Sequence, residues 1–378
     1  MTNISVTRLT PRIIADWTGL RSIWTSHDAL YGNAQSFDWI DSWHRHVNPE
    51  SFVAALFMGN TPVLMLPLEP IAVSGTHILR YPGGTHANCN FPWLNRSLAS
   101  LIDDAALDAL LAMIARERPK TDVIGLARQK ASLSGISNPL LRLKNAKNHN
   151  PVLMASLTAG FDAVLQRGNA KRKLKKHRQH ERRYNENGGW RIYAPGQREE
   201  SDQMLDVFFA LKAHRFRQMG INNPFESAKV QIFFKEIFGN AVCLDKAPFE
   251  LKALEVDGKI RSIIGKIASD DGPTVEFNAI ADDELVTASP GEFLFFEDIK
   301  SSCEARLTYY SFGIGDEPYK REWCDIEACV YDTVIPLTLK GRTFTAFQSI
   351  RKKLAATIKG NPKLWQFVKR LRSKLARR

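Results

Sequence analysis

The segment at residues 311–323, SFGIGDEPYKREW, gathers small, acidic, basic and phenolic side chains within a short space. Its two glycines permit close approach of another backbone or of a ligand. An acidic residue then precedes Pro318, and proline favours the first turn of a helix. We therefore expect a helix to begin here with Tyr319 in its first turn. The pattern predicts either a helix cap with packing around Trp323 or a functional site.

Several common catalytic motifs do not occur in the sequence. It has no GxxxxGK[ST] phosphate loop, no HExxH pair and no GxSxG elbow. The five cysteines lack CxxC spacing, which argues against a disulfide framework and a cysteine zinc site. His86 and Cys89 lie in YPGGTHANCNFPW without a second ligand pair. We expect this loop to cover the first half's core or the cleft between halves, and we expect no metal.

The net charge of +12 is concentrated at the C-terminal end. Residues 340–378 hold 13 Lys and Arg and no Asp or Glu, leaving 39 basic and 40 acidic residues elsewhere. Within Asn361–Arg378, apolar residues recur at helical spacing among the cations, which predicts a basic amphipathic helix. Such a helix can lie on an anionic membrane surface or dock on its own domain.

A second basic run, RGNAKRKLKKHRQHERRYNENGG, occupies residues 167–189. We expect a helix that ends at Gly188 and Gly189, because glycine readily adopts the left-handed capping conformation. The charges point all round such a helix, so part of the run must face water. The remainder is either a solvated surface or a binding site for phosphates of a cofactor, an RNA or a lipid.

The length of 378 residues predicts about two domains. We place them at residues 1–150 and 151–338, followed by a basic tail at 339–378. The N-terminus has no signal-peptide pattern, and the most apolar stretch is broken by glycine and prolines. We therefore expect a cytoplasmic protein, with a peripheral location at the inner membrane face as an option for the tail.

The second half has a clear order of expected elements. After the basic helix come a strand at 190–194, a helix at 199–219 and three antiparallel strands within 249–280. The turns of this meander are expected at DG (257–258) and DDGP (270–273). A helix from 290 and a strand at 307–314 follow.

This order resembles the core of the GNAT acyltransferase fold. The wording of LKAHRFRQMG, SPGEFLFFEDI and FGIGDEPYKREW resembles the CelD/BcsL-like branch, which is associated with cellulose and other exopolysaccharide production. The resemblance covers 161–335, and the first half matches more loosely through FDWIDSWHRH. It implies a mixed α/β fold of tandem GNAT-like domains with mostly antiparallel sheets, and an enzyme that transfers an acyl group, in the first instance acetyl, to an amine.

Such an enzyme needs a neutral amine, a polarised carbonyl and a proton for the departing thiolate. The fold places these groups at a splay between two strands, here TVEFNAI and YYSFGIG. We expect Glu276 to be the general base if burial raises its pKa; otherwise it is a solvent-facing strand residue. The resemblance implies that Tyr319 donates a proton and that Lys320 supplies positive charge, with Asp316 beside them.

Donor binding departs from the family pattern. GNAT proteins carry an R/Q-x-x-G-x-G/A loop for the pyrophosphate of coenzyme A, and we do not find it here. We assign Ser289, Pro290 and Gly291 at the expected helix start to this role, because a helix N-terminus binds phosphate. Asn278, on the same strand face as Glu276, completes the assignment. The donor stays open among acetyl-CoA, another acyl-CoA, an acyl carrier protein and the aminoacyl-tRNA of the related FemABX transferases.

The acceptor site has one anchor. LKAHRFRQMG lies where the fold lines the acceptor pocket, so we assign His214 and Arg215 to it; packing or surface charge also explains them. Two hypotheses remain. The chain is either an N-acyltransferase for surface polysaccharide production or a non-catalytic, GNAT-shaped adaptor that binds membrane, a polysaccharide synthase or RNA.

Overall fold

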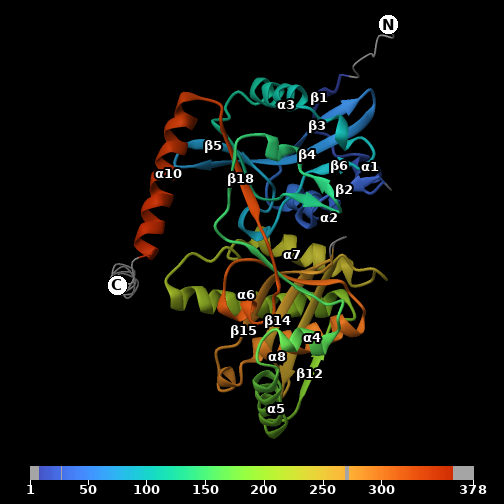
Figure 1. Cartoon of the computed structure of the whole chain (residues 1–378), viewed down its shortest axis with the longest axis vertical. Helices are drawn as coiled ribbons and strands as arrows, with labels where there is room; N and C mark the ends of the chain where they lie inside the picture. The colour runs from blue at the N-terminus through green and yellow to red at the C-terminus, as the bar shows by residue number, and fades with distance from the viewer. Residues whose placement is uncertain (1–7, 27, 269–271, 361–378) are drawn as a thin grey trace.

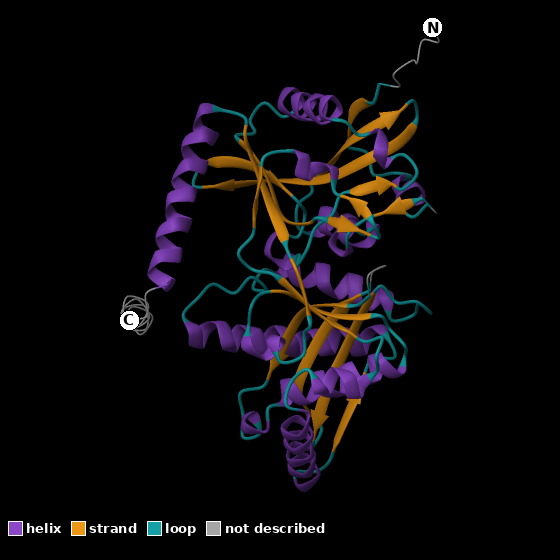
Figure 2. Cartoon of the chain, in the orientation of Figure 1, coloured by secondary structure: helices purple, strands orange, loops and turns teal. Residues whose placement is uncertain are grey.

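The computed structural model describes residues 8–26, 28–268 and 272–360, with side chains to residue 351. The amphipathic helix predicted at 361–378 lies outside the described residues. The molecule has an upper part, built mainly from the first half of the chain, and a lower part built from the second (Figure 1). Both parts combine sheets and helices (Figure 2), so the predicted mixed α/β class is confirmed.

The first half of the chain contains the following helices and strands: β1 (Thr10–Ile14), α1 (Leu20–Trp24), β2 (Ala29–Leu30), α2 (Phe37–His46), β3 (Phe52–Met58), β4 (Thr61–Val73), β5 (Thr76–Arg80), β6 (Trp93–Asn95), α3 (Asp104–Glu117), β7 (Val123–Lys130), β8 (Ser132–Leu133), β9 (Ile136–Ser137) and β10 (Asn145–Lys147). Its main sheet follows the order β1-β3-β4-β5-β7, and β6 joins β2 to β4. All these pairs are antiparallel except β5 with β7.

The second half contains these elements: β11 (Val152–Ser156), α4 (Phe161–Gln166), α5 (Ala170–Glu186), β12 (Trp190–Tyr193), α6 (Arg198–Met219), α7 (Ala228–Ala241), β13 (Phe249–Val256), β14 (Lys259–Ile267), β15 (Thr274–Ile280), α8 (Pro290–Glu304), β16 (Tyr309–Ile314), α9 (Pro318–Arg321), β17 (Ile326–Ala328), β18 (Val330–Pro336) and α10 (Leu339–Gly360). Its sheet has the order β12-β13-β14-β15-β16-β11-β17. The predicted basic helix, meander and helix from residue 290 are confirmed.

One strand returns to the first half. β18 pairs antiparallel with β7 and with β10, so it belongs to the first sheet although it follows the second in sequence. Figure 1 shows it crossing from the lower into the upper part, where α10 packs beside it and β5. The sheets change between β10 and β11, close to residue 150. The domain limits set from sequence stay a prediction, with β18 as the segment that crosses them.

Helices cover both faces of the second sheet. One face packs against α6 and α7, in a core that also includes Trp39 and Trp43 of α2. The other face packs against α4, α5 and α8 through buried residues such as Phe293, Leu294 and Tyr184. Since the first of these cores draws on both halves of the chain, the halves are fixed together by apolar packing.

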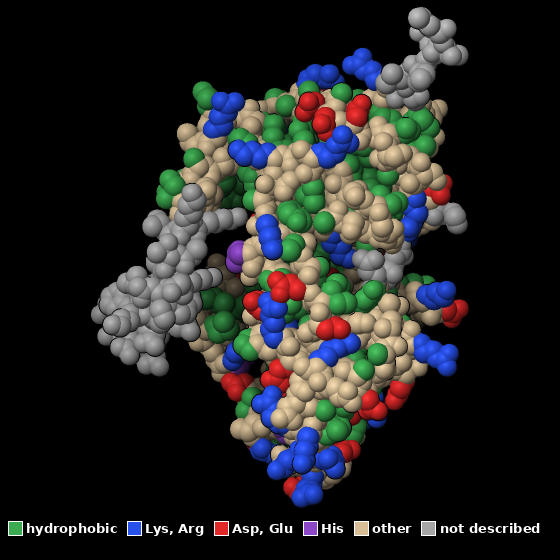
Figure 3. All heavy atoms as spheres, in the orientation of Figure 1, with side chains coloured by type: hydrophobic (Ala, Val, Ile, Leu, Met, Phe, Trp, Pro, Cys, Tyr) green, Lys and Arg blue, Asp and Glu red, His purple; other side chains and the backbone are tan. Residues whose placement is uncertain are grey.

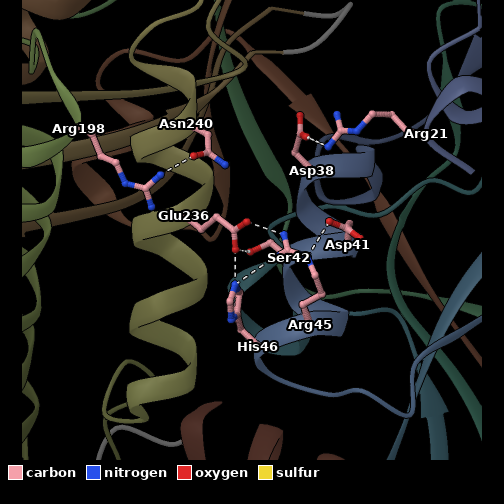
Figure 4. A network of polar contacts seen from close by, with 9 residues as sticks. All are labelled: Arg21, Asp38, Asp41, Ser42, Arg45, His46, Arg198, Glu236 and Asn240. Carbon is pink, nitrogen blue, oxygen red and sulfur yellow. Dashed lines mark hydrogen bonds and ion pairs between the residues drawn. The ribbon is translucent and has the colours of Figure 1, made fainter. Parts of the chain in front are cut away.

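A polar network reinforces this junction between α2 and α7 (Figure 4). The carboxylate of Glu236 accepts hydrogen bonds from Ser42 at 3.1 Å and from Arg45 at 2.5 Å, and it pairs with His46. Arg45 also pairs with Asp41 at 3.0 Å. Because α7 carries Phe233 and Phe234 inward, these contacts position the aromatic wall at the interface of the two halves.

Candidate active site

β15 and β16 separate where the sequence predicted an opening. They pair in parallel at a single position, Thr274 with Ser311. Beyond it, Asn88 from the first half enters the gap: its amide nitrogen donates to the carbonyl oxygens of Val275 and Glu276, each at 3.2 Å. Its oxygen accepts from the Ile314 N–H at 3.3 Å. A residue from the first half therefore bridges the two strands.

Glu276 sits at an irregularity of β15. Gly265 pairs with Phe277 and Lys266 pairs with Val275, so Glu276 is the extra residue opposite β14. A bulge of this kind breaks the alternation of the strand and redirects a side chain. Gly265 makes room for the ring of Phe277, because a Cβ there would lie 2.1 Å from that ring.

The Glu276 carboxylate lies in an environment that suits a base. Burial raises its pKa to about 7, although hydrogen bonds from the Asn88 side chain and backbone oppose this shift. The Asn88 amide donates to Oε2 at 2.6 Å and the Asn88 N–H donates at 3.2 Å. A carboxylate with a pKa near neutrality can accept a proton at physiological pH and release it again.

Two cavities meet at this place. The helix cavity, of about 500 Å³, lies at the start of α8 and is lined by Arg172, Lys173, Lys176, Asn278, Ile280, Val286, Ser289, Pro290, Gly291, Glu292, Phe295, Tyr319, Glu322 and Trp323. The interdomain cavity, of about 250 Å³, is lined by Thr85, His86, Asn88, Lys212, Pro224, Phe225, Phe234, Val275, Glu276, Phe277, Asn278, Phe312, Ile314, Glu317, Tyr319 and Lys320. Asn278 and Tyr319 line both.

Tyr319 stands between the two cavities. Its ring stacks on Phe295 with 5.9 Å between centroids and 21° between planes, and 40% of the residue is exposed. Burial raises the pKa of its phenol to about 12, and the phenol also interacts with the Asn278 side chain. Tyr319 therefore keeps its proton at neutral pH and can donate it into either cavity.

The start of α8 forms one end of the helix cavity. Ser289 precedes the helix with a φ of 49° and makes no side-chain capping bond, and Pro290 occupies the first turn. Gly291 packs under Ile280: a Cβ on the glycine would lie 2.6 Å from Ile280 Cδ1. The first amides of a helix have no intrahelical partners and carry a partial positive charge, so they favour an anion.

Three cations of α5 line the same cavity. Lys173 is buried, with its ammonium 3.7 Å from the centroid of the Trp323 ring and 2.5 Å from the Glu322 carbonyl oxygen. Lys176 pairs with Glu292, and Arg172 pairs with the Glu322 carboxylate at 3.2 Å. The three cations outnumber the two carboxylates, which leaves the cavity with excess positive charge.

Lys320 lines the interdomain cavity and Asp316 lines neither cavity, and the catalytic roles that the resemblance implies for them stay predictions. Lys320 is buried, and its ammonium donates to the Ile314 carbonyl at 2.9 Å and pairs with Glu317 at 2.8 Å, so it secures the turn after β16. Asp316 is exposed and pairs with Arg321 at 2.5 Å. Asp316 lines neither cavity, because its side chain points to this surface partner.

The two residues predicted to bind the acceptor lie outside both cavities, and their role stays a prediction. His214 and Arg215 are exposed on α6 and line neither cavity, and His214 contacts Gln218 at 2.9 Å. The residue of α6 that lines the interdomain cavity is Lys212, two positions before His214. Sequence reasoning missed Lys212 and Asn88, although it did expect the loop at 81–93 to cover a core or the cleft between the halves.

His86 belongs to the wall of the interdomain cavity. Its ring packs against Phe225 at 4.9 Å and Phe234 at 5.4 Å between centroids. Burial, with a smaller contribution from the charge of Arg80, lowers the pKa of His86 to about 4. The imidazole is therefore neutral at pH 7 and contributes an aromatic surface without charge. Within the described ranges, no group of three His, Cys, Asp or Glu is arranged to hold a metal ion.

Comparisons with known proteins identify the fold of the second half. Residues 171–321 match the family model described as an acetyltransferase (GNAT) domain. No curated protein sequence matches the chain significantly. Over residues 8–26, 28–268 and 272–360, no helix is both long and apolar enough to span a bilayer.

Among solved structures, FemX aligns with a TM-score of 0.52 and 10% identity, over 83% of this chain and 95% of FemX. A conserved protein of unknown function from Bacteroides thetaiotaomicron aligns with a TM-score of 0.50 and 12% identity, over 83% and 94%. A tandem GNAT protein from the clavulanic acid biosynthesis pathway covers 87% of this chain and 98% of its own, with a TM-score of 0.48 and 10% identity. Residues 171–321 thus match a GNAT domain, and the two-part fold of the chain is similar to that of FemX.

Proposed function

We propose that this protein is an N-acyltransferase that moves an acyl group, such as acetyl, from a CoA thioester to an amine. The observation that supports this most directly is the meeting of two cavities at Asn278 and Tyr319. One cavity offers a helix start and cations to phosphates, and the other holds Glu276 as a base. A transfer reaction needs two adjoining sites of this kind, because donor and acceptor must meet at one point.

The reaction assigns one proton to each of two residues. The neutral amine attacks the thioester carbonyl carbon from the interdomain cavity, and a C–N bond forms while Glu276 takes a proton from the nitrogen. The C–S bond then breaks, and the thiolate takes the proton of the Tyr319 phenol. Solvent protons restore Tyr319, and Glu276 releases its proton to solvent. The products are an amide and free CoA thiol.

The donor occupies the helix cavity in this proposal. Its phosphates face the amide of Gly291 and the guanidinium of Arg172, and its thioester reaches Tyr319. Anions are stabilised at a helix N-terminus and by arginine, which binds phosphate through two parallel hydrogen bonds. The side chain of Arg172 is mostly exposed, so it can exchange Glu322 for a phosphate at little cost.

A second donor class, an acyl group carried on RNA, is favoured by the exposed face of α5. Figure 3 shows Lys and Arg side chains gathered at the lower tip of the molecule, where Figure 1 places α5. The exposed cations of this helix are Lys171, Arg172, Lys175, Arg178 and Arg182. Phosphodiester backbones bind such surfaces with a strong dependence on salt. An adaptor without catalysis, bound to a membrane or a synthase through the basic tail, remains the non-enzymatic alternative.

Release of CoA thiol tests the proposal and its pH dependence together. We expect amine-dependent release from acetyl-CoA or a longer acyl-CoA, measured with a thiol reagent across a panel of primary amines. After correction for amine ionisation, kcat/KM should rise with pH and level off above about 7. The sign follows from the raised pKa of Glu276: the carboxylate is protonated, and inactive as a base, below that value.

The outcomes separate the alternatives. A rate that is flat from pH 5 to pH 9 would contradict the role of Glu276. Release of thiol without amine would indicate hydrolysis instead of transfer. Failure with every CoA thioester, together with transfer from aminoacyl-tRNA, would establish the RNA-linked donor. We also propose an exopolysaccharide setting, from the sequence resemblance, and a membrane contact through the basic tail.

A further inference from the structure

Lys212 lines the interdomain cavity with an ammonium group that has no ion-pair partner among the described residues. It projects from α6, with its ammonium 5.8 Å from the Phe208 ring centroid and 5.7 Å from that of Phe216. Among the described residues, no carboxylate forms an ion pair with it. The other lysine of this cavity, Lys320, is held by Glu317 and by the carbonyl oxygen of Ile314. The cavity therefore contains one ammonium that lacks a counter-ion.

A half-buried ammonium without a partner costs free energy, and the cation–aromatic contacts offset only part of this cost. Burial, with a smaller contribution from the charge of Arg215, lowers the pKa of Lys212 to about 8. At pH 7 most molecules still carry the charge. Its neighbour in the cavity, His86, is neutral at that pH because burial lowers its pKa to about 4. The positive charge at this end of the cavity therefore comes from Lys212.

The rest of the cavity divides by chemistry. Glu276 lies on the side of the splayed strands, where Asn88 holds its carboxylate. The rings of Phe225 and Phe234 form an apolar wall. A volume of about 250 Å³ suits a small molecule or the end of a larger one. A base, an unpaired cation and an apolar wall complement a molecule with an amine, an acidic group and an apolar part.

We propose that the acceptor is a small amine that also carries an acidic group, and that Lys212 binds this group while the amine faces Glu276. This inference rests on the proposed acyl transfer. The inference is narrower than the proposed function, because transfer to amines without an acidic group would agree with acyl transfer but would contradict a role for Lys212 in acceptor binding. The acidic group is a carboxylate or a phosphate, and both bind an ammonium by charge-assisted hydrogen bonds.

Chemical labelling of Lys212 tests the binding site without requiring turnover. The full-length protein is treated with N-hydroxysuccinimidyl acetate, and the acetylation of each lysine is followed by mass spectrometry. Lys229, exposed on α7 and outside the cavity, serves as the internal reference. Phenylacetate, phenylphosphonate and the neutral phenylacetamide are the probes. We expect the acids to slow labelling of Lys212 relative to Lys229, and the amide to leave it unchanged.

The labelling outcomes are decisive. Protection by phenylacetate alone supports a carboxylate, and protection by phenylphosphonate alone supports a phosphate. Equal protection by the acids and the amide, or protection by none of them, would overturn the proposal. Because this readout needs no donor, absence of thiol release in the turnover assay would remove the acyltransferase function without altering the labelling result.

Kinetics provide the second measurement. In Lys212→Met, which keeps the length and the apolar part of the side chain, we expect KM for amino acids to rise about tenfold or more. KM for the corresponding amino acid amides and kcat should stay near the wild-type values. Lys229→Met is the matched control and should change neither. A wild-type enzyme that uses amino acids and their amides equally well would also contradict the proposal.

Discussion

Replacing Glu276 by glutamine is expected to lower kcat by about 10²–10⁴-fold, the usual contribution of a positioned general base. Glutamine preserves the shape of the side chain and one acceptor for the Asn88 amide, so the fold should persist. Donor affinity should persist as well, because Glu276 does not line the helix cavity. The measurement is thiol release under saturating donor and acceptor, with circular dichroism to check the fold.

The matched control is Glu199→Gln. Glu199 is exposed in the first turn of α6 and lines neither cavity. Its replacement should leave kcat close to that of the wild type. If both variants lose activity equally, or if Glu276→Gln keeps the wild-type rate, the assignment of the base is wrong.

Replacing Asp298 by alanine is expected to destabilise the protein by about 3–5 kcal/mol, the usual cost of removing one partner from a buried ion pair. The Asp298 side chain is 0% exposed and binds Lys252 at 2.8 Å and Lys266 at 2.9 Å. It also accepts a hydrogen bond from the Tyr310 hydroxyl at 2.7 Å. The substitution leaves the two ammonium groups with Glu250, which is partly exposed and pairs with Lys252 at 3.3 Å and with Lys266 at 3.2 Å, and removes their buried counter-ion. Urea unfolding followed by fluorescence measures the loss.

The pH dependence of stability follows from the same contacts. Burial opposes ionisation of Asp298, but the ammonium groups of Lys266 and Lys252 outweigh it and lower its pKa. The stabilisation is therefore present above the unfolded pKa of about 3.9 and is lost as pH falls through the lower folded pKa. Asp316→Ala, which removes an exposed carboxylate, is the control and should barely change the unfolding midpoint. Equal midpoints for wild type and Asp298→Ala would contradict the account.

This buried network also explains how α8 is positioned. Asp298 lies on α8, whereas Lys252, Lys266 and Tyr310 come from β13, β14 and β16. One carboxylate therefore ties the helix to three strands of the sheet. The start of α8 forms one end of the helix cavity. We therefore expect Asp298→Ala to weaken donor binding as well, because α8 loses a contact that fixes its position.

Local sequence patterns predicted most of the second half. The meander turn at Asp257–Gly258 has φ values of 52° and 68°, which the Asp-Gly pair favours. α5 ends at Glu186, shortly before the two glycines expected to stop it. The helix at 290 begins with proline, as expected. These features depend on residues that are neighbours in the chain, so a single sequence contains the information.

Long-range features could not be read in this way. α7 was not predicted, although its buried residues Val230, Phe233 and Phe234, with Ile237 and Phe238, recur at helical spacing, so here a local signal was present and was missed. β18 pairs with strands about 200 residues earlier, and no local signal announces such a return. The contact of Asn88 with Glu276 spans 188 positions. The bulge at Glu276 is defined by the pairing of β15 with β14, which only the folded sheet shows.

The halves therefore share the site. Glu276 and Tyr319 lie within residues 171–321, which match the GNAT family model. Asn88 and His86 come from the first half of the chain. The residue pattern and the family resemblance together predicted a site at residues 311–323. In the structure Tyr319 lines both cavities, Lys320 lines one of them with its ammonium bonded to the Ile314 carbonyl, and Asp316 pairs with Arg321 at the surface. Their catalytic roles stay predictions.

The most direct test of the central claim is calorimetric titration of the full-length protein with acetyl-CoA and a long-chain acyl-CoA. Arg172→Glu, in the helix cavity, is compared with Arg182→Glu, which makes the same charge change on an exposed part of α5 outside both cavities. The account predicts saturable binding to the wild type, weakened about tenfold or more in Arg172→Glu and little changed in Arg182→Glu. Absence of binding by either thioester, or equal weakening in both variants, would contradict it.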